Sequence, residues 1–280
     1  MALVTVVVVT DASSRLPVDL IEKWAIRVVP LHILLDGHDL LDGVDDVPDD
    51  IYKRDATTAA ATPAELANAY QQALADSGGD GVVAVHISSA LSGTYGAAER
   101  TAADLDPNVR VIDSKSAAMG TGFVALAAAR VAAAGADLDA VAGAASSAVS
   151  RGRAFVVVHR LDNLRRSGRI GGAKAWLGTA LALKPLLRID DGKLVLAQRV
   201  RTITHATATM IDRVCEVVGE GPAALAVHHV ANPDGANEVA AALAERLPAC
   251  EPAIITPLGP VLALHVGGGA VAVCLELPES

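Results

Sequence analysis

Residues 81–100 read GVVAVHISSALSGTYGAAER, an apolar run followed by a turn rich in serine and glycine. The run Gly81–Ile87 predicts a strand covered on both faces, and Gly93–Leu105 predicts a helix. The segment SSALSGT, Ser88–Thr94, lies between them. In open α/β sheets, ligands bind beyond the carboxyl ends of the strands, where a helix N-terminus favours an anion. The segment therefore predicts an anion-binding site, and the alternative is that these residues only cap the helix and form the turn.

Strands and helices alternate around this segment. The apolar patterns predict strands at 3–9, 27–35 and 109–112 and helices at 17–24 and 63–76, and residues 42–55 form an irregular excursion. Thr62 and Glu65 have the spacing of a capping box. Two alanine-rich helices, broken near Gly135, follow the last of these strands. This order predicts a right-handed βαβ series, with a mostly parallel sheet in a three-layer sandwich.

The second half begins again with a strand and mixes hairpins with helices. Asp191-Gly192 separates two apolar runs, at 186–189 and 194–200, and is a hairpin signal. The other expected elements are a strand at 154–158, short helices over 161–182, a helix from a Thr204 cap to Val218, a strand at 223–227, a helix at 234–247, a strand at 253–256, a short apolar segment to Val266 and a final strand at 270–277.

We therefore predict an α/β fold of two α/β domains. Residues 1–150 form the N-terminal domain with the mostly parallel sheet, and residues 151–280 form a C-terminal domain with a mixed sheet. The final segment is free to pack back on the N-terminal domain. A pocket between two such halves is the default place for a ligand.

Composition limits the classes of partner. The 280 residues carry a net charge of −9, yet Arg151–Arg201 holds twelve basic and three acidic side chains. An acidic bulk argues against general nucleic-acid binding, whereas a local basic stretch fits a phosphate, an acidic partner or a membrane surface, or is simply a solvated face. The three cysteines are scattered, and the N-terminal apolar run lacks the features of a signal peptide, so we expect a cytoplasmic protein.

Three further segments carry candidate binding residues. Thr57-Thr58-Ala59 is a hydroxyl-bearing loop, LRRSGRIGG at 164–172 places arginines beside glycines, and His265 precedes three glycines. Arginine suits the bidentate recognition of a carboxylate or phosphate. Each segment also has a structural explanation, as a helix cap, an exposed helix end or a turn. The sequence contains no nucleophile elbow, no phosphate loop and no metal-ligand spacing.

Taken in order, these segments resemble the DegV family, whose members include the fatty-acid-binding subunit of bacterial fatty acid kinase. The resemblance spans nearly the whole chain. It runs through VTDASSRLP, the TT-A-A-A-TP loop, HISSALSGTYGAA, VIDSKSAAMGTG, LRRSGRIGG, LALKPLL, RVRT and LGPVLALHVGGG. It implies two α/β domains that enclose one long-chain fatty acid, with the carboxylate at the domain interface and the acyl chain in an internal tunnel.

The resemblance also implies roles for individual residues. The residues matched to the carboxylate site are Thr58, Ser92, Gly93, Arg169 and His265, and Arg201, Arg165 and Arg166 are matched to contacts around it or to a partner. The chain departs from the family pattern at Ala59, Ala60 and Ala61, where serine, glutamine and proline are usual. It departs again at Val266 and Gly268, where threonine and proline are usual.

The function implied is that of a carrier without catalytic residues, metal or cofactor, acting in phospholipid metabolism. It binds a long-chain fatty acid and presents it to a separate ATP-dependent kinase of the dihydroxyacetone-kinase-like type, which makes an acyl phosphate. The basic stretch then meets that kinase, the phosphate or, transiently, an anionic membrane. Two alternatives stay open: a stand-alone phosphotransferase or hydrolase that uses Ser92 or His265, and a regulatory module in which lipid is structural.

Overall fold

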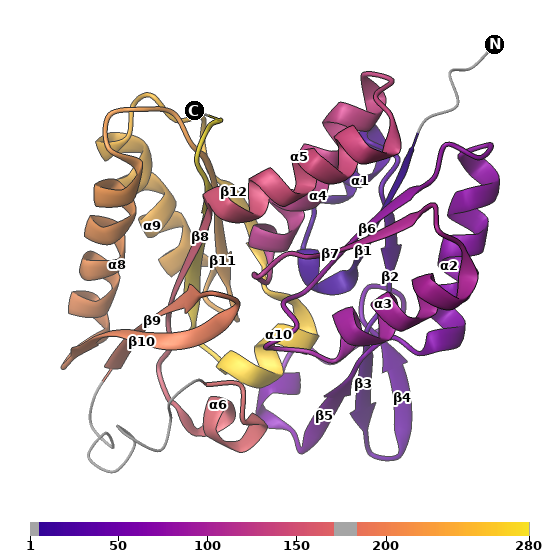
Figure 1. The fold of residues 1–280 in the computed structure, drawn as a ribbon. Helices are drawn as coiled ribbons and strands as arrows, with labels where there is room; N and C mark the ends of the chain where they lie inside the picture. The colour runs from indigo at the N-terminus through magenta and orange to yellow at the C-terminus, as the bar shows by residue number, and fades with distance from the viewer. Residues whose placement is uncertain (1–5, 171–183, 280) are drawn as a thin grey trace.

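The computed structural model describes residues 6–170 and 184–279, which form two large sheets with helices between and outside them (Figure 1). Sheet A is parallel, with strand order β2-β1-β6-β7. Its strands are β1 (Val7–Asp11), β2 (Arg27–Val29), β6 (Val82–His86) and β7 (Val109–Asp113). The helices of this half are α1 (Val18–Lys23), α2 (Pro63–Asp76), α3 (Thr94–Leu105), α4 (Met119–Ala133) and α5 (Leu138–Arg151). Helices α2 and α3 cover one face of sheet A, and α4 and α5 cover the other.

A small antiparallel sheet, sheet B, projects from this half and was not predicted. It contains β3 (His32–Leu35), β4 (His38–Leu41) and β5 (Ala56–Ala59), in the order β4-β3-β5. The prediction of one strand over 27–35 is wrong, because the chain leaves sheet A after Val29 at Pro30, which has no N–H to donate to a ladder. The supposed excursion includes the 3-10 turn η2 (Ile51–Lys53), and Thr58 lies on a strand, not in a loop.

The second half is built on sheet C, which is mixed, with strand order β10-β9-β8-β13-β11-β12. Its strands are β8 (Gly152–Val157), β9 (Lys184–Asp190), β10 (Lys193–Val200), β11 (Ala224–His229), β12 (Ile254–Pro257) and β13 (Val271–Glu276). The helices are α6 (Asp162–Ser167), α8 (Ile203–Val218), α9 (Pro233–Arg246) and α10 (Gly259–Val266). The predicted α/β fold with one parallel and one mixed sheet is confirmed.

Not all of the features predicted from local sequence signals in the second half are present in the structure. The Asp191-Gly192 hairpin is present, with positive φ at both residues. The predicted Thr204 cap is wrong, because Thr202 caps α8 by accepting a hydrogen bond from the N–H of His205. The short apolar segment ending at Val266 is helix α10. Residues 171–182 of the predicted short helices lie outside the described residues.

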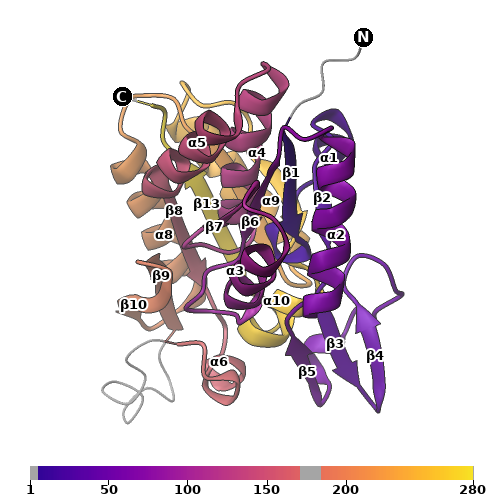
Figure 2. The same ribbon diagram turned by 45° about the vertical axis from the view of Figure 1, so that its right-hand side comes forward.

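Helix α4 is shared by the two halves. It packs against β1 and β6 of sheet A and against β8 and β13 of sheet C (Figure 2). One continuous hydrophobic cluster includes Val85 of sheet A, Ala125 of α4 and Val156 of sheet C. A helix that is apolar all round is buried, and alanines let both sheets approach it closely. The two halves therefore share a hydrophobic core, and the domain boundary at residue 150 stays a prediction.

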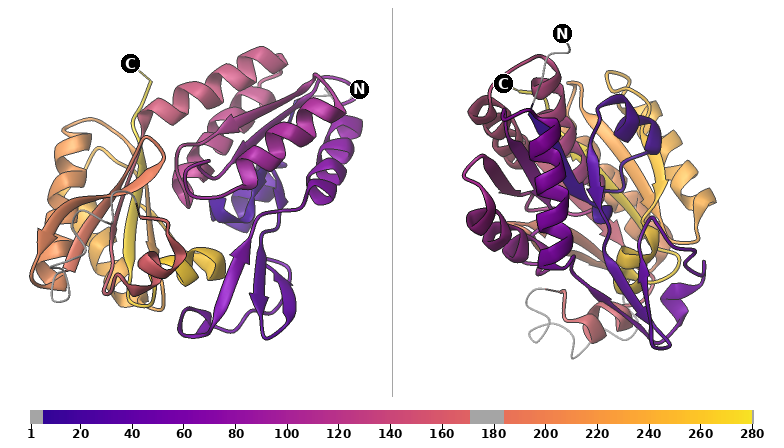
Figure 3. Two further views of the ribbon diagram at one scale, coloured as in Figure 1. Left: turned by 60° about the horizontal axis from the view of Figure 1, so that its bottom comes forward. Right: turned by 90° about the vertical axis from the view of Figure 1, so that its right-hand side faces the viewer.

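Helix α10 also crosses between the halves. It follows β12 of sheet C, yet it contacts β3 and β5 of sheet B as well as α6 (Figure 3). Within the described residues, no helix is long and apolar enough to span a membrane. The position of α10 brings residues near the end of the sequence against residues 56–59, and the candidate site lies there.

Candidate functional site

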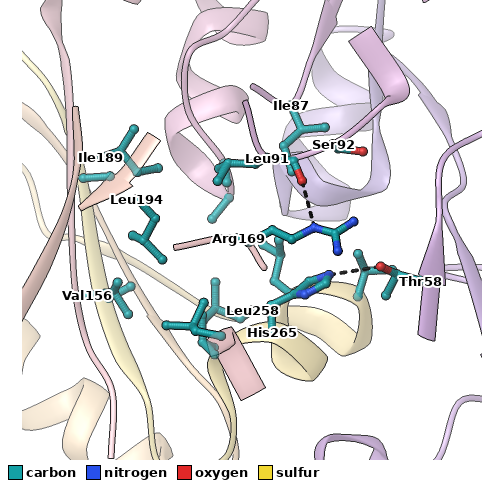
Figure 4. Close-up of a pocket in the computed structure, with 18 of the residues that line it drawn as sticks. Thr58, Ile87, Leu91, Ser92, Val156, Arg169, Ile189, Leu194, Leu258 and His265 are labelled. Atoms are coloured by element: carbon teal, nitrogen blue, oxygen red, sulfur yellow. Dashed lines mark hydrogen bonds between the residues drawn. The ribbon is translucent and has the colours of Figure 1, made fainter. Parts of the chain in front are cut away.

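A cavity of about 150 Å³ lies where the two halves meet. Its wall includes five of the residues expected at a carboxylate, namely Thr58, Ser92, Gly93, Arg169 and His265. The rest of the wall is almost entirely aliphatic or aromatic. Figure 4 shows the polar side chains on one side of the pocket and Val156, Ile189 and Leu194 on the other. The pocket is therefore amphipathic along its length.

The loop after β6 forms the first part of the polar end. The hydroxyl of Ser92 lies 2.9 Å from that of Thr94 and accepts the Thr94 N–H at 3.3 Å. Thr94 begins α3, whose first N–H groups lack partners within the helix and favour a negative charge. Gly93 has an ordinary negative φ, and a Cβ built there meets no atom within 4 Å. The backbone at Gly93 thus borders open space, and Gly93 is part of the pocket wall.

Thr58 and His265 form the second part, although 207 residues separate them in the sequence. The Thr58 hydroxyl lies 3.0 Å from Nε2 of His265, which joins β5 to α10. The Nδ1 atom of His265 is buried and finds no hydrogen-bond partner among the described residues. Burial, with the nearby charge of Arg169, lowers the pKa of His265 to about 4. The imidazole is therefore neutral at neutral pH.

Arg169 stands at the mouth of the pocket. Helix α6 ends at Gly168, whose φ of 69° is the left-handed conformation that glycine allows at a helix end. The chain then turns back, so that Nε of Arg169 donates to the carbonyl of Leu91 at 3.4 Å. The side chain is exposed and lies between the Ser92 loop and His265 in Figure 4. A guanidinium here can pair with an anion that enters the polar end.

The other three predicted arginines lie outside the pocket wall. Arg165 and Arg166 are exposed on α6, and Arg201 is exposed between β10 and α8. Asn163 fixes α6 to its surroundings by donating to the carbonyls of Tyr52 and Leu264. The structure thus gathers five of the eight candidate residues around one cavity, and the ligand roles of all eight stay predictions.

Part of the apolar wall is formed by sheet C. In the pairing of β8 with β13, Ala154 faces Cys274 and Val156 faces Ala272, and all four line the pocket. Side chains alternate between the faces of a strand, so these small residues lie together. Burial raises the pKa of the Cys274 thiol to about 12, so the thiol is protonated at neutral pH. The alternation of small and large side chains in Ala270–Leu275 was the sequence signal that could have placed Cys274 on the same face as Ala272.

The family model described as "Uncharacterised protein, DegV family" matches residues 5–277. The chain belongs to the DegV family. A DegV domain-containing protein of Mycobacterium tuberculosis is 76% identical over 276 residues, or 99% of each chain. The structure of a DegV family protein from Thermus thermophilus, described by its fatty acid binding, aligns with a TM-score of 0.91 and 31% identity, and covers 98% of this chain and 100% of that one. The structure of DegV from Bacillus subtilis, described as a fatty acid binding protein, aligns with a TM-score of 0.89 and 26% identity, and covers 98% of this chain and 100% of that one.

Some of the positions at which we expect this DegV chain to depart from the family pattern line the pocket. Ala59, Ala60 and Val266 line it, and Ala61 is buried. Alanine methyl groups offer no hydrogen bond to a ligand at these positions. The Thr58 hydroxyl is therefore the side-chain donor that this segment brings to the cavity wall.

A buried polar network lies beneath the Ser92 loop of the DegV chain and was not predicted from the sequence. Asp11, at the end of β1, accepts the Ile87 N–H at 2.9 Å and lies 3.0 Å from Nδ1 of His86. Nε2 of that ring lies 2.8 Å from the Tyr70 hydroxyl. Burial acts to raise the pKa of Asp11, but the hydrogen bond and charge of His86 outweigh it and lower the pKa. The signal was an Asp and a His at the carboxyl ends of adjacent parallel strands.

The network has a positional consequence. Asp11 also accepts the Ser13 N–H at 3.0 Å, so one carboxylate holds the ends of β1 and β6 together. Ile87, whose N–H it binds, lines the pocket. Within residues 6–170 and 184–279, no group of three His, Cys, Asp or Glu side chains is arranged to hold a metal ion.

Proposed function

We propose that this chain binds one long-chain fatty acid, with the carboxylate at the polar end of the pocket and the acyl chain along sheet C. The observation that carries the proposal is a cavity with polar groups at one end and an apolar interior. The carboxylate-binding residues are Thr58, Ser92, Gly93, Arg169 and His265. The two relatives described as fatty-acid-binding, at 31% and 26% identity over nearly the whole chain, support the same ligand class.

Energetics support the two-part arrangement. A buried carboxylate costs several kcal/mol unless it is hydrogen-bonded, and hydroxyls, a helix N-terminus and a guanidinium meet that need here. Each buried CH₂ contributes about 0.8 kcal/mol, so a sixteen-carbon chain contributes on the order of 12 kcal/mol before association costs. The acyl chain supplies the affinity, and the polar end sets the orientation.

We further propose that the chain is a cytoplasmic, non-catalytic carrier that presents its ligand to an ATP-dependent kinase of the dihydroxyacetone-kinase-like type. Gly93 and Arg169 are exposed, so the polar end of the pocket is within reach of a partner protein. A carboxylate oxygen attacks the γ-phosphorus of ATP on the kinase, the bond to ADP breaks, and an acyl phosphate forms. The exposed arginines Arg165, Arg166 and Arg201 are available for the contact with that kinase or with the new phosphate.

The binding proposal is tested with Ser92→Ala. Losing a hydrogen bond to a charged group costs about 1.5–3 kcal/mol, so affinity for palmitate should fall about 10- to 100-fold. Affinity for hexadecanol, which lacks the charge, should change much less. Ser89→Ala is the matched control, because Ser89 is an exposed neighbour outside the pocket wall. Equal losses for acid and alcohol contradict a carboxylate at Ser92.

Native mass spectrometry of the purified protein provides a direct check, with denaturing release of any bound lipid. A C14–C18 acid at one molecule per chain is the expected result. A protein that carries no lipid and also fails to bind palmitate and oleate refutes the proposal. Acyl phosphate formed from ATP and fatty acid without a kinase refutes the non-catalytic role.

A further inference from the structure

The tip of the β9–β10 hairpin extends past the part of sheet C that holds it. Strand β9 pairs with β8 through Leu186, Leu187 and Arg188, whereas its pairing with β10 continues to the turn. Strand β10 is the edge of the sheet, and its register shifts between Leu196 and Gln198. Among the described residues, the hairpin tip Ile189–Leu194 therefore has no pairing with β8. Its position depends on the pairing of β9 with β10 and on contacts from outside the sheet.

One of those contacts comes from the loop that contains Ser92. The buried hydroxyl of Ser88 donates to the carbonyl of Gly192 at 2.8 Å, and it accepts the Ala90 N–H at 3.2 Å. The Lys115 ammonium lies 3.6 Å from the carboxylate of Asp191, in the same turn. A neighbouring bridge pairs Ile170 with Leu194. The Ser88 bond is the buried, directional member of this set.

Gly192 fits this contact closely. Its φ is +77°. A Cβ built there clashes with the Ser88 hydroxyl and lies 3.2 Å from the Lys115 side chain. Any side chain at 192 therefore pushes the hairpin tip away from the loop. The turn Asp36-Gly37 also has positive φ at both residues, but a Cβ at Gly37 meets nothing within 4 Å.

The hairpin tip is also part of the pocket. Ile189 and Leu194, on either side of the turn, both line the apolar wall. Ser88 itself accepts the Ser92 N–H through its backbone carbonyl at 3.0 Å. One loop thus carries Ser92 to the polar end and holds, through Gly192, the strand pair that covers the apolar end.

We propose that Ser88 is a positioning residue for the acyl chain: through Gly192 it holds the β9–β10 hairpin closed over the bound chain. The inference rests on the proposed fatty acid binding. It separates the roles of two serines four positions apart, since Ser92 recognises the carboxylate and Ser88 controls how long the chain is retained.

The test compares Ser88→Ala and Gly192→Ala with matched controls, Ser89→Ala and Gly37→Ala. Dissociation of palmitate is followed by stopped-flow displacement with a fluorescent C16 acid. Each of the first two variants should speed dissociation about 3- to 10-fold, the range that the loss of one hydrogen bond allows. The preference for palmitate over hexadecanol, which Ser92→Ala lowers, should stay at its wild-type value. The controls should dissociate at the wild-type rate.

Two further readouts exclude a merely structural role. If both residues act through one contact, the double variant Ser88→Ala/Gly192→Ala dissociates no faster than the faster single variant. Amide hydrogen exchange at 189–194 should speed up in both single variants, while exchange in sheet A stays unchanged. Wild-type dissociation in both single variants, additive effects, or loss of acid preference in Ser88→Ala overturns the inference. Wild-type protein that binds no fatty acid overturns the proposed function itself.

Discussion

His265 should make the stability of the ligand-free protein depend on pH in a defined direction. Burial and the charge of Arg169 lower the pKa of His265 to about 4 in the folded protein, whereas an exposed histidine titrates near 6.5. As the pH falls below 6.5, the unfolded chain takes up a proton before the folded chain does. The contribution of His265 to the free energy of unfolding is therefore fully present above pH 6.5 and decreases progressively towards pH 4.

The magnitude follows from the shift. One pKa unit corresponds to 1.36 kcal/mol, so the whole contribution is about 3 kcal/mol, of which about 2 kcal/mol is lost by pH 5. His265→Gln removes the titration and keeps a hydrogen-bonding group near Thr58. Other buried histidines, such as His228 with a pKa lowered by burial to about 3, are common to both proteins and cancel in the difference.

The assay is urea unfolding of delipidated wild-type protein and His265→Gln between pH 7.5 and 4.5. The unfolding free energy of the wild type minus that of His265→Gln should fall by about 2 kcal/mol between pH 7.5 and pH 5. Parallel curves refute the reasoning, as does an NMR titration of the His265 ring with a midpoint at or above 6.5. Added palmitate should move that midpoint upward, because a carboxylate beside the ring favours the imidazolium.

Two other substitutions test the geometry of the polar end. Gly93→Ala places a methyl group where no protein atom lies within 4 Å, so the melting temperature should hold within about 2 °C while palmitate affinity falls about tenfold or more; unchanged affinity would show that no ligand approaches there. Asp11→Asn removes a buried charge that holds Ile87 and His86, so urea unfolding should show a loss of about 3 kcal/mol, and a loss under 1 kcal/mol would contradict the role of the network.

The parts of the fold that the sequence predicted are those with strong local signals. The apolar run of β6, the glycine before α3 and the Thr62–Glu65 capping box each specify an element boundary by local chemistry, and all three are present. Sheet B was missed because β4 is exposed or half-buried and carries His38 and Asp39, which leaves no apolar alternation to detect. Pairing with β3 in the tertiary fold, not propensity, determines this strand.

The candidate site was predictable only in part for a related reason. Ser92 follows a strand end, and that position predicts a binding loop from sequence alone. The meeting of Thr58 with His265 depends on α10 leaving sheet C and packing on β5, and no periodicity in either segment shows that return. Family resemblance supplied the pair, and the 3.0 Å contact is the physical fact behind it.

The place of β13 in sheet C bears on how the protein is made in the cell. This strand lies between β8 and β11, yet it is the last of the six strands to leave the ribosome. Until it emerges, β8 has no partner on that side, and the α4 face that packs on β13 stays uncovered. Sheet A, whose four strands are all synthesised earlier, can assemble first. The pocket, whose wall includes Ala272 and Cys274, is therefore completed only after β9 to β12 have been synthesised.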